Sequence, residues 1–248
     1  MELNGKVALV TGGGTGLGKE ISLQLARAGA DVAINYTKSV ADAEATASEI
    51  EALGRRAMIV RADVSKEAEV KAMVEAVVKT LGGVDLLVNN AGYTIFADFR
   101  DLDAVAEEEW DRIMAVNVKG AFLVSRAAAP IMRARGAGAI VNVTSTAGVR
   151  AGGSSIPYSV SKAAENQLSR CLAISLAPEI TVNAVAPGLM DTRWGRLWGD
   201  AHVENTGKGS PLGHLATLEE IAESVIFLLK NRSTSGQTFV LDGGRTQY

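Results

Sequence analysis

A tyrosine and a lysine four positions apart stand in the segment 158–162, which reads Tyr-Ser-Val-Ser-Lys. On a helix, residues at i and i+4 lie on the same face, so Tyr158 and Lys162 are expected to be neighbours. A free tyrosine keeps its proton until about pH 10, but a nearby ammonium stabilises the tyrosinate and suits the phenol to proton transfer. Because this spacing also arises by chance, the pair alone is a weak indication of catalysis.

A glycine-rich loop reads Thr-Gly-Gly-Gly-Thr-Gly-Leu-Gly over residues 11–18. Glycines let a backbone turn sharply and approach a pyrophosphate, whose charge the N-terminus of a following helix stabilises. The spacing is G-x-x-x-G-x-G through Gly12, Gly16 and Gly18, and differs from the G-x-G-x-x-G fingerprint. Its place after a strand and at the beginning of a helix favours phosphate binding over an ordinary tight turn.

The end of the second expected strand reads Asn-Tyr-Thr-Lys-Ser over residues 35–39, and the next acidic residue is Asp42. NAD enzymes usually place Asp or Glu about 20 residues beyond the glycines, where it binds the ribose 2′-hydroxyl. Lys38, with the hydroxyls of Thr37 and Ser39, suits a 2′-phosphate instead, although no Arg accompanies it. We therefore expect NADP as the cofactor, with NAD as the alternative. If Lys38 has no part in cofactor binding, it would be a solvated side chain on a turn.

The elements that must position these residues alternate between short β-branched runs and longer amphipathic stretches. Strands are expected at 7–11, 32–36, 58–61, 84–89, 139–144, 181–186 and 238–241, and helices at 18–28, 41–53, 67–81, 107–135, 158–176 and 218–229. The runs lack polar alternation, as is typical of parallel strands covered on both faces. The order predicts an α/β fold, a single doubly wound Rossmann-type domain over residues 1–248 with a seven-stranded parallel sheet. An eight-fold barrel is the second choice.

The longest irregular region covers residues 188–214. A loop of this length in a compact domain is usually functional, and the sequence predicts a substrate lid. Trp194 and Trp198 favour this interpretation over a surface excursion, because an exposed tryptophan without a partner is costly. The other pocket walls are expected from 93–96 and 147–156, with an apolar or ring-stacking character. In the lid, Arg193 and Arg196 could meet an acidic substrate.

Composition and charge limit the class of function. With 47 % hydrophobic and 21 % charged residues, the 248-residue chain can bury a large core. A net charge of −3 argues against a nucleic-acid binder. The absence of a long apolar run or signal peptide, together with a single cysteine, predicts a soluble cytoplasmic protein that does not bind a membrane. Cys171 is expected to be buried in its helix, and the spacing of the two histidines predicts no metal site.

Several motifs, taken in order, resemble the short-chain dehydrogenase/reductase family. Besides the Tyr158/Lys162 pair and the glycine loop, they include Ser145, thirteen positions before the tyrosine. The others are Asn89-Asn90-Ala91-Gly92, Asp63-Val64, Asn117, Pro187-Gly188 with Thr192, and Leu241-Asp242-Gly243-Gly244. The resemblance extends along nearly the whole chain. The most similar types are 3-oxoacyl-acyl-carrier reductases and small-ketone or sugar dehydrogenases, although a mixed surface around Arg126, Arg133 and Glu179 does not favour a carrier-bound substrate.

The resemblance implies a catalytic set of Asn117, Ser145, Tyr158 and Lys162. Tyr158 would be the general acid in reduction and the base in oxidation, and Lys162 would support it and hold the nicotinamide ribose hydroxyls. Ser145 would orient the substrate oxygen, and Asn117 would fix a water that relays protons to Lys162. As structural alternatives, Asn89 would brace the strand ends, Asn117 would be a polar helix residue, and Ser145 a turn hydroxyl.

The resemblance also implies a set of cofactor contacts. These residues are Gly12, Thr15, Gly16, Leu17, Gly18, Tyr36, Thr37, Lys38, Asp63, Val64, Asn90, Ala91, Gly92, Tyr158, Lys162, Pro187, Gly188, Met190 and Thr192. Asp63 would contact the adenine and Asn90 would lie near the adenine-side ribose. Thr192 would meet the carboxamide or the pyrophosphate.

The predicted function is an NADP(H)-dependent oxidoreductase that interconverts a carbonyl and a secondary alcohol of a small molecule by hydride transfer. An NAD-dependent alcohol or sugar dehydrogenase on the same site is the alternative, and a non-catalytic NAD(P)-sensing protein is a remote one. A serine hydrolase is disfavoured because the sequence around Ser145 is no nucleophile elbow and neither histidine has a persuasive acidic partner. The resemblance further implies a homotetramer.

Overall fold

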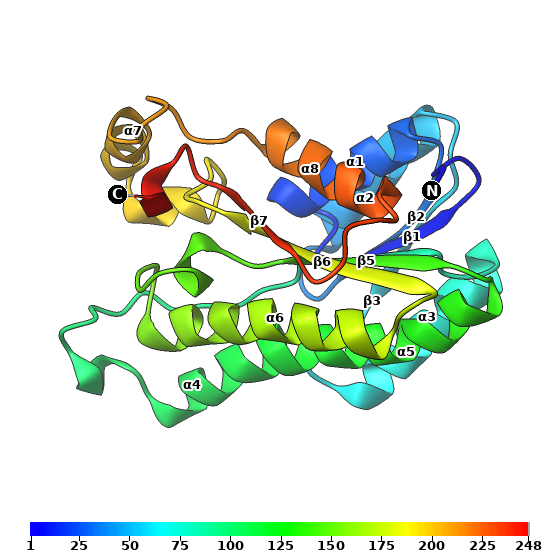
Figure 1. The fold of residues 1–248 in the computed structure, drawn as a ribbon, viewed down its shortest axis with the longest axis horizontal. Helices are drawn as coiled ribbons and strands as arrows, with labels where there is room; N and C mark the ends of the chain where they lie inside the picture. The colour runs from blue at the N-terminus through cyan, green and yellow to red at the C-terminus, as the bar shows by residue number, and fades with distance from the viewer. Residues whose placement is uncertain (248) are drawn as a thin grey trace.

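Seven parallel strands form one open sheet in residues 1–247, which are the residues that the structure, a computed structural model, describes (Figure 1). The strand order is β3-β2-β1-β4-β5-β6-β7. Their bounds are β1 Val7–Val10, β2 Asp31–Tyr36, β3 Ala57–Arg61, β4 Leu86–Asn89, β5 Gly138–Val143, β6 Ile180–Pro187 and β7 Thr238–Leu241. This arrangement confirms the predicted doubly wound α/β fold and excludes a barrel, because β3 and β7 are the edges of an open sheet.

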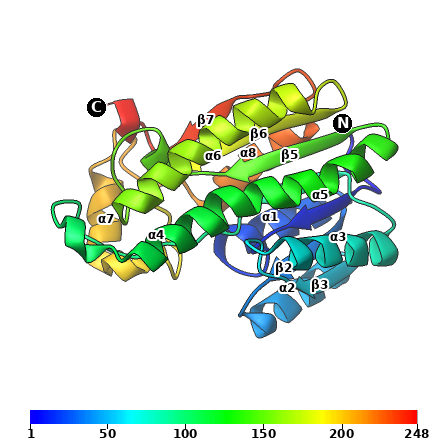
Figure 2. The same ribbon diagram turned by 90° about the horizontal axis from the view of Figure 1, so that it is seen from below.

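Helices cover both faces of the sheet (Figures 1 and 2). One layer consists of α1 Gly16–Arg27, α2 Val40–Ala52 and α8 Leu218–Lys230. The other contains α3 Glu67–Leu81, α4 Glu107–Met114, α5 Ala121–Ala134 and α6 Ile156–Ser175. Successive strand residues therefore point into two different cores: Ala8 and Val10 into the first, Val7 and Leu9 into the second. Because both sides are buried, β1 carries apolar residues at every position and the other central strands are mostly apolar.

The start of α6 fixes the position of the Tyr158 side chain. Ser155 is the N-cap, and its side chain accepts a hydrogen bond from the Tyr158 backbone N–H at 3.4 Å. Pro157 follows in the first turn, where its missing N–H costs nothing. The helix therefore begins at Ile156, two residues before the predicted start, and Tyr158 lies in its first turn.

The predicted helix over 107–135 is not uniform. The π-helical segment η2, Ala115–Gly120, separates α4 from α5 and contains Asn117. A π turn is a local widening of the helix that often occurs at functional sites, and periodicity alone does not reveal it. The expectation of one regular helix was wrong in this segment.

The region 188–214 also differs from the prediction. It contains a short 3₁₀ turn, Gly195–Trp198, and the helix α7, Asp200–Lys208. Only Val203 and Gly207 of α7 are buried, so this helix lacks the apolar period by which a helix is recognised in a sequence.

Cys171 is exposed, which contradicts the expectation of a buried side chain. The face of α6 that points to the sheet contains polar residues, among them Lys162, Glu165 and Ser169, together with Leu172. The positions of the apolar residues in the sequence therefore did not indicate which face of this helix is buried. Within residues 1–247, no helix has the length and apolar character needed to cross a membrane.

Candidate active site

The carboxyl ends of β1, β4, β5 and β6 bring distant motifs to one edge of the sheet. The chain leaves β1 toward β2 and leaves β4 toward β5, so a crevice opens between β1 and β4, where open α/β sheets bind ligands. The glycine loop follows β1, and Asn90 follows β4. Ser145 follows β5, and Gly188 follows β6. The predicted site residues on these four segments thus share one crevice.

The glycine loop packs so tightly that larger residues would not fit. A Cβ on Gly18 would overlap the carbonyl oxygen of Gly12, and one on Gly14 would lie 2.9 Å from Ala43 Cα. Gly12 and Gly16 adopt positive φ angles of 62° and 51°. The Leu17 side chain is buried in the core, so only its backbone is available to a cofactor.

The N-terminus of α1 is suited to an anion. Its N-cap, Thr15, makes no side-chain capping hydrogen bond, and the first turn has no acidic residue. The first backbone N–H groups of a helix lack partners within the helix, and the helix dipole favours negative charge there. Together with the close approach that the glycines permit, these residues fit a dinucleotide pyrophosphate.

Asn90, Ala91 and Gly92 are fixed against the glycine loop. The Thr11 hydroxyl accepts hydrogen bonds from the backbone N–H groups of Asn90 and Ala91, at 2.9 and 3.0 Å. The Asn90 side-chain amide donates to the carbonyl oxygens of Thr11 and Gly12. The side chain of Asn90 therefore braces the loop, whereas a Cβ on Gly92 would lie 3.7 Å from Asn117 and from Trp194.

At the adenosine end, an arginine lies beside the residues predicted to select the cofactor. Arg61 pairs with Tyr36 in the β2–β3 register, and its Nε donates to the Thr37 carbonyl oxygen at 3.3 Å. Lys38 is exposed on the same turn. Sequence reasoning found no arginine here because Arg61 is 24 residues from Thr37 in the chain; the parallel pairing of the two strands was the signal that could have located it.

Asp63 lines a hollow together with Thr37 and Arg61, and the next residue, Val64, is buried. The Asp63 carboxylate accepts hydrogen bonds from the Ser65 backbone and hydroxyl and from Arg112. Although burial acts to raise the pKa of Asp63, these hydrogen bonds from Ser65 and Arg112 hold it below its usual value. Asp63 is therefore a fixed anionic acceptor at the position predicted for an adenine contact.

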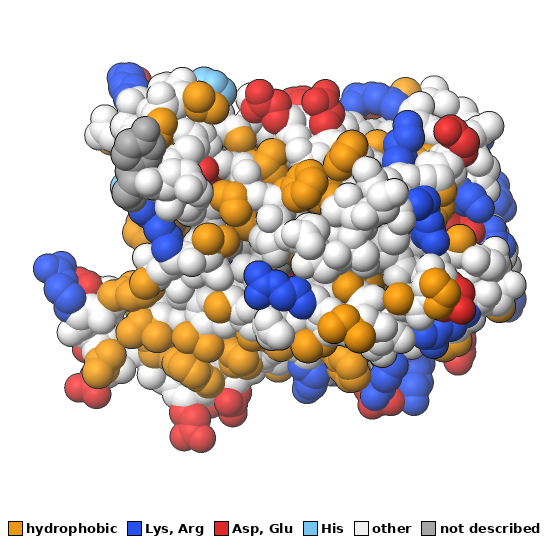
Figure 3. Space-filling model, viewed as in Figure 1, with side chains coloured by type: hydrophobic (Ala, Val, Ile, Leu, Met, Phe, Trp, Pro, Cys, Tyr) orange, Lys and Arg blue, Asp and Glu red, His pale blue; other side chains and the backbone are white. Residues whose placement is uncertain are grey.

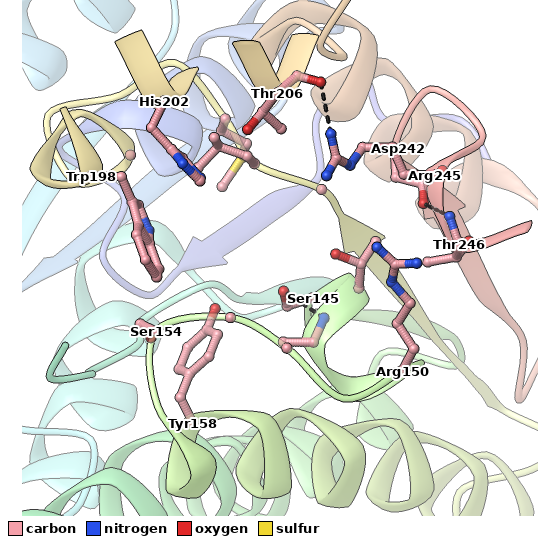
Figure 4. Close-up of a pocket in the computed structure, with 18 of the residues that line it drawn as sticks. Ser145, Arg150, Ser154, Tyr158, Trp198, His202, Thr206, Asp242, Arg245 and Thr246 are labelled. Carbon is pink, nitrogen blue, oxygen red and sulfur yellow. Dashed lines mark hydrogen bonds between the residues drawn. The ribbon is translucent and has the colours of Figure 1, made fainter. Parts of the chain in front are cut away.

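Ser145 and Tyr158 line one cavity of about 350 Å³. Figure 4 shows the Tyr158 hydroxyl pointing into this cavity toward the side where Ser145 lies. The Ser145 Oγ accepts a hydrogen bond from the Ala147 backbone N–H at 3.1 Å, which orients the side chain. A substrate oxygen in this cavity can therefore be reached by both hydroxyls.

Lys162 lies one turn after Tyr158 and is almost completely buried. Its Nζ is 5.7 Å from the centre of the Tyr158 ring and donates to the Val143 carbonyl oxygen at 3.0 Å. The same ammonium is 2.6 Å from Glu165 Oε2. Although burial acts to lower the pKa of Lys162, the charges of Glu165 and Tyr158 raise it above its usual value. The ammonium form is therefore favoured beside the tyrosine.

Asn117 is fully buried and holds the chain that follows Gly92. Its Oδ1 accepts from the Tyr93 backbone N–H at 2.8 Å, and its Nδ2 donates to the Tyr93 carbonyl oxygen and to Ser161 Oγ. All of these contacts are structural. The predicted water relay to Lys162 is not among them and stays a proposal.

Asn89 and Asn142 form a buried polar bridge between strands and helices. Asn89 Nδ2 donates to Asn142 Oδ1 at 2.8 Å and to Ser125 Oγ at 3.0 Å, and Asn142 Nδ2 donates to Ser169 Oγ. Ser169 in turn donates to the Glu165 carbonyl oxygen. The contacts of Asn89 match the alternative in which this residue braces the strand ends.

The region 188–214 lies over the crevice. A Cβ on Gly16 would lie 3.6 Å from Thr192 Cγ2, so Thr192 lies beside the glycine loop. The rings of Trp194 and Tyr158 are 6.2 Å apart, edge to face. Pro187 ends β6, and Gly188 and Met190 line the cavity with Trp194. This segment therefore lies beside both the glycine loop and Tyr158.

One expectation about the pocket walls was wrong. Residues 93–96 are absent from the cavity lining among the described residues; the Tyr93 hydroxyl turns away to Glu109. Arg193 and Arg196 are engaged by acidic side chains outside the lining, Arg193 by Asp42. Phe96 makes an edge-to-face contact with Trp198, which lines the cavity.

The predicted walls from 147–156 and 188–214 do line the cavity: Arg150 belongs to the first segment, and His202, which stacks on Trp198, belongs to α7 in the second (Figure 4). Arg245, beyond β7, lines the cavity as well. Arg245 donates to the Thr206 carbonyl oxygen at 2.8 Å, which fixes its side chain at the wall. The sequence did not indicate Arg245, because it comes from a separate segment and shares no spacing with the other pocket residues.

The chain is similar throughout to known proteins of one family. The family model described as short chain dehydrogenase matches residues 6–201. A protein of Streptomyces violaceoruber that bears a ketoacyl reductase name within the granaticin polyketide synthase is 40 % identical over 240 residues, which are 96 % of this chain and 95 % of that protein. The 3-oxoacyl-acyl-carrier-protein reductase FabG of a Staphylococcus epidermidis strain is 38 % identical over 244 residues, covering 96 % of this chain and 98 % of that protein.

A solved structure agrees with this relationship. A protein of Burkholderia xenovorans, named in its title as a short-chain dehydrogenase/reductase, superposes with a TM-score of 0.93 at 32 % identity and covers 98 % of both chains.

Proposed function

Because this chain belongs to the short-chain dehydrogenase/reductase family, and is thereby an NAD(P)-dependent oxidoreductase, we propose that it interconverts a carbonyl and a secondary alcohol with NADP(H). The observation that carries the proposal is the shared cavity of Ser145 and Tyr158, with the buried Lys162 ammonium one turn behind the tyrosine. The Tyr158 proton donor, the Ser145 hydroxyl that would orient the substrate and the Lys162 ammonium that would stabilise the tyrosinate thus lie in one part of the structure.

In the direction of reduction, the substrate oxygen is held between Ser145 Oγ and the Tyr158 hydroxyl. The nicotinamide supplies the hydride when it is bound. Tyr158 then donates its proton to the developing alkoxide, and the Lys162 ammonium stabilises the tyrosinate that remains. In oxidation, the tyrosinate takes the proton from the alcohol. Asn117 is part of this proposal as the residue that positions a relay water behind Lys162.

The preference for NADP over NAD rests on charge at the end of β2. Lys38 and Arg61 bring two positive side chains to this turn, and the first carboxylate after the strand, Asp42, is paired with Arg193. A 2′-phosphate would gain charge-assisted hydrogen bonds from Lys38 and Arg61. The proposed contacts are Tyr36, Thr37 and Lys38 on the ribose phosphate, and Asp63 and Val64 near the adenine.

The segment 188–214 is proposed to be a substrate lid. Its contacts run from Thr192 at the glycine loop to Trp194 at the Tyr158 ring, so closure over the crevice would exclude water from both reactants. The residues that would hold the nicotinamide side are Pro187, Gly188, Met190 and Thr192, whereas Asn90, followed by Ala91 and Gly92, would lie near the adenine-side ribose. The proposed substrate is a small carbonyl compound, and the relatives are named for reduction of ketoacyl groups.

A homotetramer is also part of the proposal. Figure 3 shows hydrophobic side chains gathered over α4 and α6 and, separately, over α8. The exposed large residues on these faces include Trp110, Phe122, Val160 and Ile174 on α4 to α6, and Phe227 on α8. Two separate apolar faces are what a tetramer with two kinds of interface requires. A cytoplasmic location is proposed because a single cysteine permits no intrachain disulfide.

The test is a panel of ketones, aldehydes and secondary alcohols, followed at 340 nm with NADPH or NADH and with the oxidised forms in the reverse direction. Turnover of at least one carbonyl compound, with a higher kcat/KM for NADPH than for NADH, supports the proposal. Faster turnover with NADH would reject the cofactor assignment. Tight cofactor binding without turnover over the whole panel would favour a cofactor-sensing protein.

A further inference from the structure

A buried carboxylate lies directly behind the tyrosine–lysine pair and has no part in the mechanism above. Glu165 follows Lys162 by three residues on α6, and the two side chains are 2 % and 4 % exposed. Glu165 Oε2 is 2.6 Å from Lys162 Nζ, and among the described residues no other hydrogen-bond partner reaches this oxygen. Burying a carboxylate is costly unless a charge compensates it, so the side chain depends on Lys162.

The elements packed around this pair contribute neutral groups. The Val143 carbonyl oxygen of β5 accepts from Lys162 Nζ, and Gly148 of the turn after β5 lies against the Lys162 backbone. Asn142 of β5 reaches Ser169, whose hydroxyl donates to the Glu165 carbonyl oxygen. Along the described chain, the charges that act on Lys162 are those of Glu165 and Tyr158, and the charge that acts on Glu165 is that of Lys162.

Several charged residues on the neighbouring helices are paired elsewhere, and Glu107, Glu108, Asp111 and Lys119 are exposed. On α4, Glu109 accepts from the Tyr93 hydroxyl and Arg112 binds Asp63. On α5, Arg126 pairs with Glu67 of α3. Tyr158, Lys162 and Glu165 therefore form a coupled titrating unit along one face of α6, at positions i, i+4 and i+7.

The carboxylate changes what the ammonium does to the tyrosine. A single buried ammonium attracts a nearby tyrosinate strongly, because the surroundings screen its charge poorly. An ammonium in contact with a carboxylate is a neutral ion pair, and its attraction for the tyrosinate is partly cancelled by repulsion from the carboxylate. The charge state of Glu165 must therefore affect how readily Tyr158 releases its proton.

We propose that Glu165 is a positioning residue that acts through Lys162 and sets the pH range in which Tyr158 exchanges its proton. The inference rests on the proposed role of Tyr158 as general acid and base. With Glu165 ionised, Tyr158 retains its proton, which is the form that reduction needs. With Glu165 protonated, the uncompensated ammonium favours the tyrosinate, which is the form that oxidation needs.

The proton affinity of Glu165 places this effect in the neutral range. Burial raises the pKa of Glu165 to about 7, against the opposing effect of the Lys162 ammonium. Both charge states of the carboxylate are then populated near neutral pH. A carboxylate at the surface would be ionised at every pH near neutral and would provide no such coupling.

The experiment replaces Glu165 by its neutral isostere, Glu165→Gln. Two midpoints are measured: the pH dependence of kcat/KM for alcohol oxidation, and the tyrosinate absorbance of the cofactor-free protein near 295 nm. The absorbance of Tyr158 is isolated by subtracting the titration of the same protein with Tyr158→Phe. Removal of the negative charge is expected to lower both midpoints by about one pH unit. Unchanged or higher midpoints would overturn the proposal.

Two further Glu165 variants and one surface control separate the effect of the charge from other effects of a substitution. Glu165→Asp retains the charge and is expected to keep midpoints near those of the unmodified protein. Glu165→Leu is a second neutral variant in case the buried amide of Gln destabilises the fold, and it is expected to shift the midpoints in the same direction as Gln. Glu179→Gln, on the surface, controls for the loss of a carboxylate elsewhere.

The outcomes separate this inference from the proposed function. If Tyr158→Phe leaves turnover intact, the proposed role of Tyr158 fails, whatever the variants of Glu165 do. If Tyr158→Phe abolishes turnover while Glu165→Gln leaves both midpoints in place, only the role of Glu165 fails.

Discussion

The Lys162 ammonium lies 5.7 Å from the centre of the Tyr158 ring, one helical turn away and almost completely enclosed by protein. The geometry depends on the start of α6, because the Ser155 cap and Pro157 fix the first turn in which Tyr158 stands. It also depends on β5, whose Val143 carbonyl oxygen binds the ammonium. A charge held so firmly can stabilise a tyrosinate without reorganisation during the reaction.

Replacement of Tyr158 by Phe removes one hydroxyl and little else. Because general acid–base catalysis contributes typically 10²–10⁴-fold, kcat is expected to fall by roughly that factor. Cofactor affinity, measured by calorimetric titration, is expected to stay within a few-fold. Tyr93→Phe is the matched control, since that hydroxyl binds Glu109 outside the cavity, and it should retain turnover. Near-normal kcat in Tyr158→Phe would contradict the mechanism.

Replacement of Gly18 by Ala should abolish tight cofactor binding. The added Cβ would overlap the Gly12 carbonyl oxygen, so the loop must move away from the position that admits a pyrophosphate. The Kd for NADPH is expected to rise more than tenfold by calorimetric titration. Gly207→Ala is the control, because it adds the same atom to a helical glycine whose nearest contact would be an ordinary 3.4 Å. An unchanged Kd in Gly18→Ala would show that the cofactor does not use this loop.

Removal of the two positive charges at the end of β2 should lower kcat/KM with NADPH and leave kcat/KM with NADH nearly unchanged. A hydrogen bond to a charged group contributes about 1.5–3 kcal/mol, so Lys38→Ala and Arg61→Ala should each lower kcat/KM for NADPH roughly tenfold or more. The value for NADH should change little, because it has no 2′-phosphate. Lys79→Ala, on the exposed side of α3, is the control for net charge. Equal losses with both cofactors would reject the 2′-phosphate assignment.

A charge placed on the apolar face of α5 should break the proposed tetramer. Phe122 is 38 % exposed in the isolated chain, and Phe122→Glu would bury a carboxylate in an interface. Sedimentation velocity at micromolar concentration is expected to show a tetramer for the unmodified protein and a smaller species for the variant. Leu53→Glu changes an apolar residue just after α2, away from both faces, and should leave the mass unchanged. A monomer in the unmodified protein would reject the assembly.

Asp85 should stabilise the fold in a pH-dependent way. Its carboxylate binds Arg135 through two contacts of 2.8 and 2.9 Å and accepts from the Val7 backbone N–H. Although burial acts to raise the pKa of Asp85, these hydrogen bonds from Arg135 and Val7 hold it below its usual value of 3.8. A depressed pKa means stability that is present above pH 3.8 and is lost as the pH falls through the lower native value.

Asp85→Asn is therefore expected to lower the free energy of unfolding by about 2 kcal/mol at pH 7, measured in urea. The difference from the unmodified protein should shrink as the pH falls below 3.8. Asp98→Asn, in a surface pair with Arg100, should change stability little at either pH. A difference between Asp85→Asn and the unmodified protein that does not depend on pH would contradict the ionic role.

The features that the sequence predicted are local in the chain. Strands covered on both faces, a glycine turn before a helix, and the i, i+4 spacing of Tyr158 and Lys162 each depend on residues within a few positions of one another. Backbone geometry alone then decides which side chains share a face. For this reason the sheet, the glycine turn before α1 and the proximity of Tyr158 and Lys162 were predictable, and the i+7 spacing of Glu165 would have indicated its place on the same face of α6.

Tertiary structure alone decided which distant residues meet. Arg61 reaches Thr37 because β2 and β3 pair in a particular register, and Arg245 reaches the cavity because the chain after β7 returns to the crevice. The burial of Glu165 depends on α6 turning a polar face to the sheet. These contacts join residues far apart in the chain, and packing of the whole fold, which no local pattern records, brings them together.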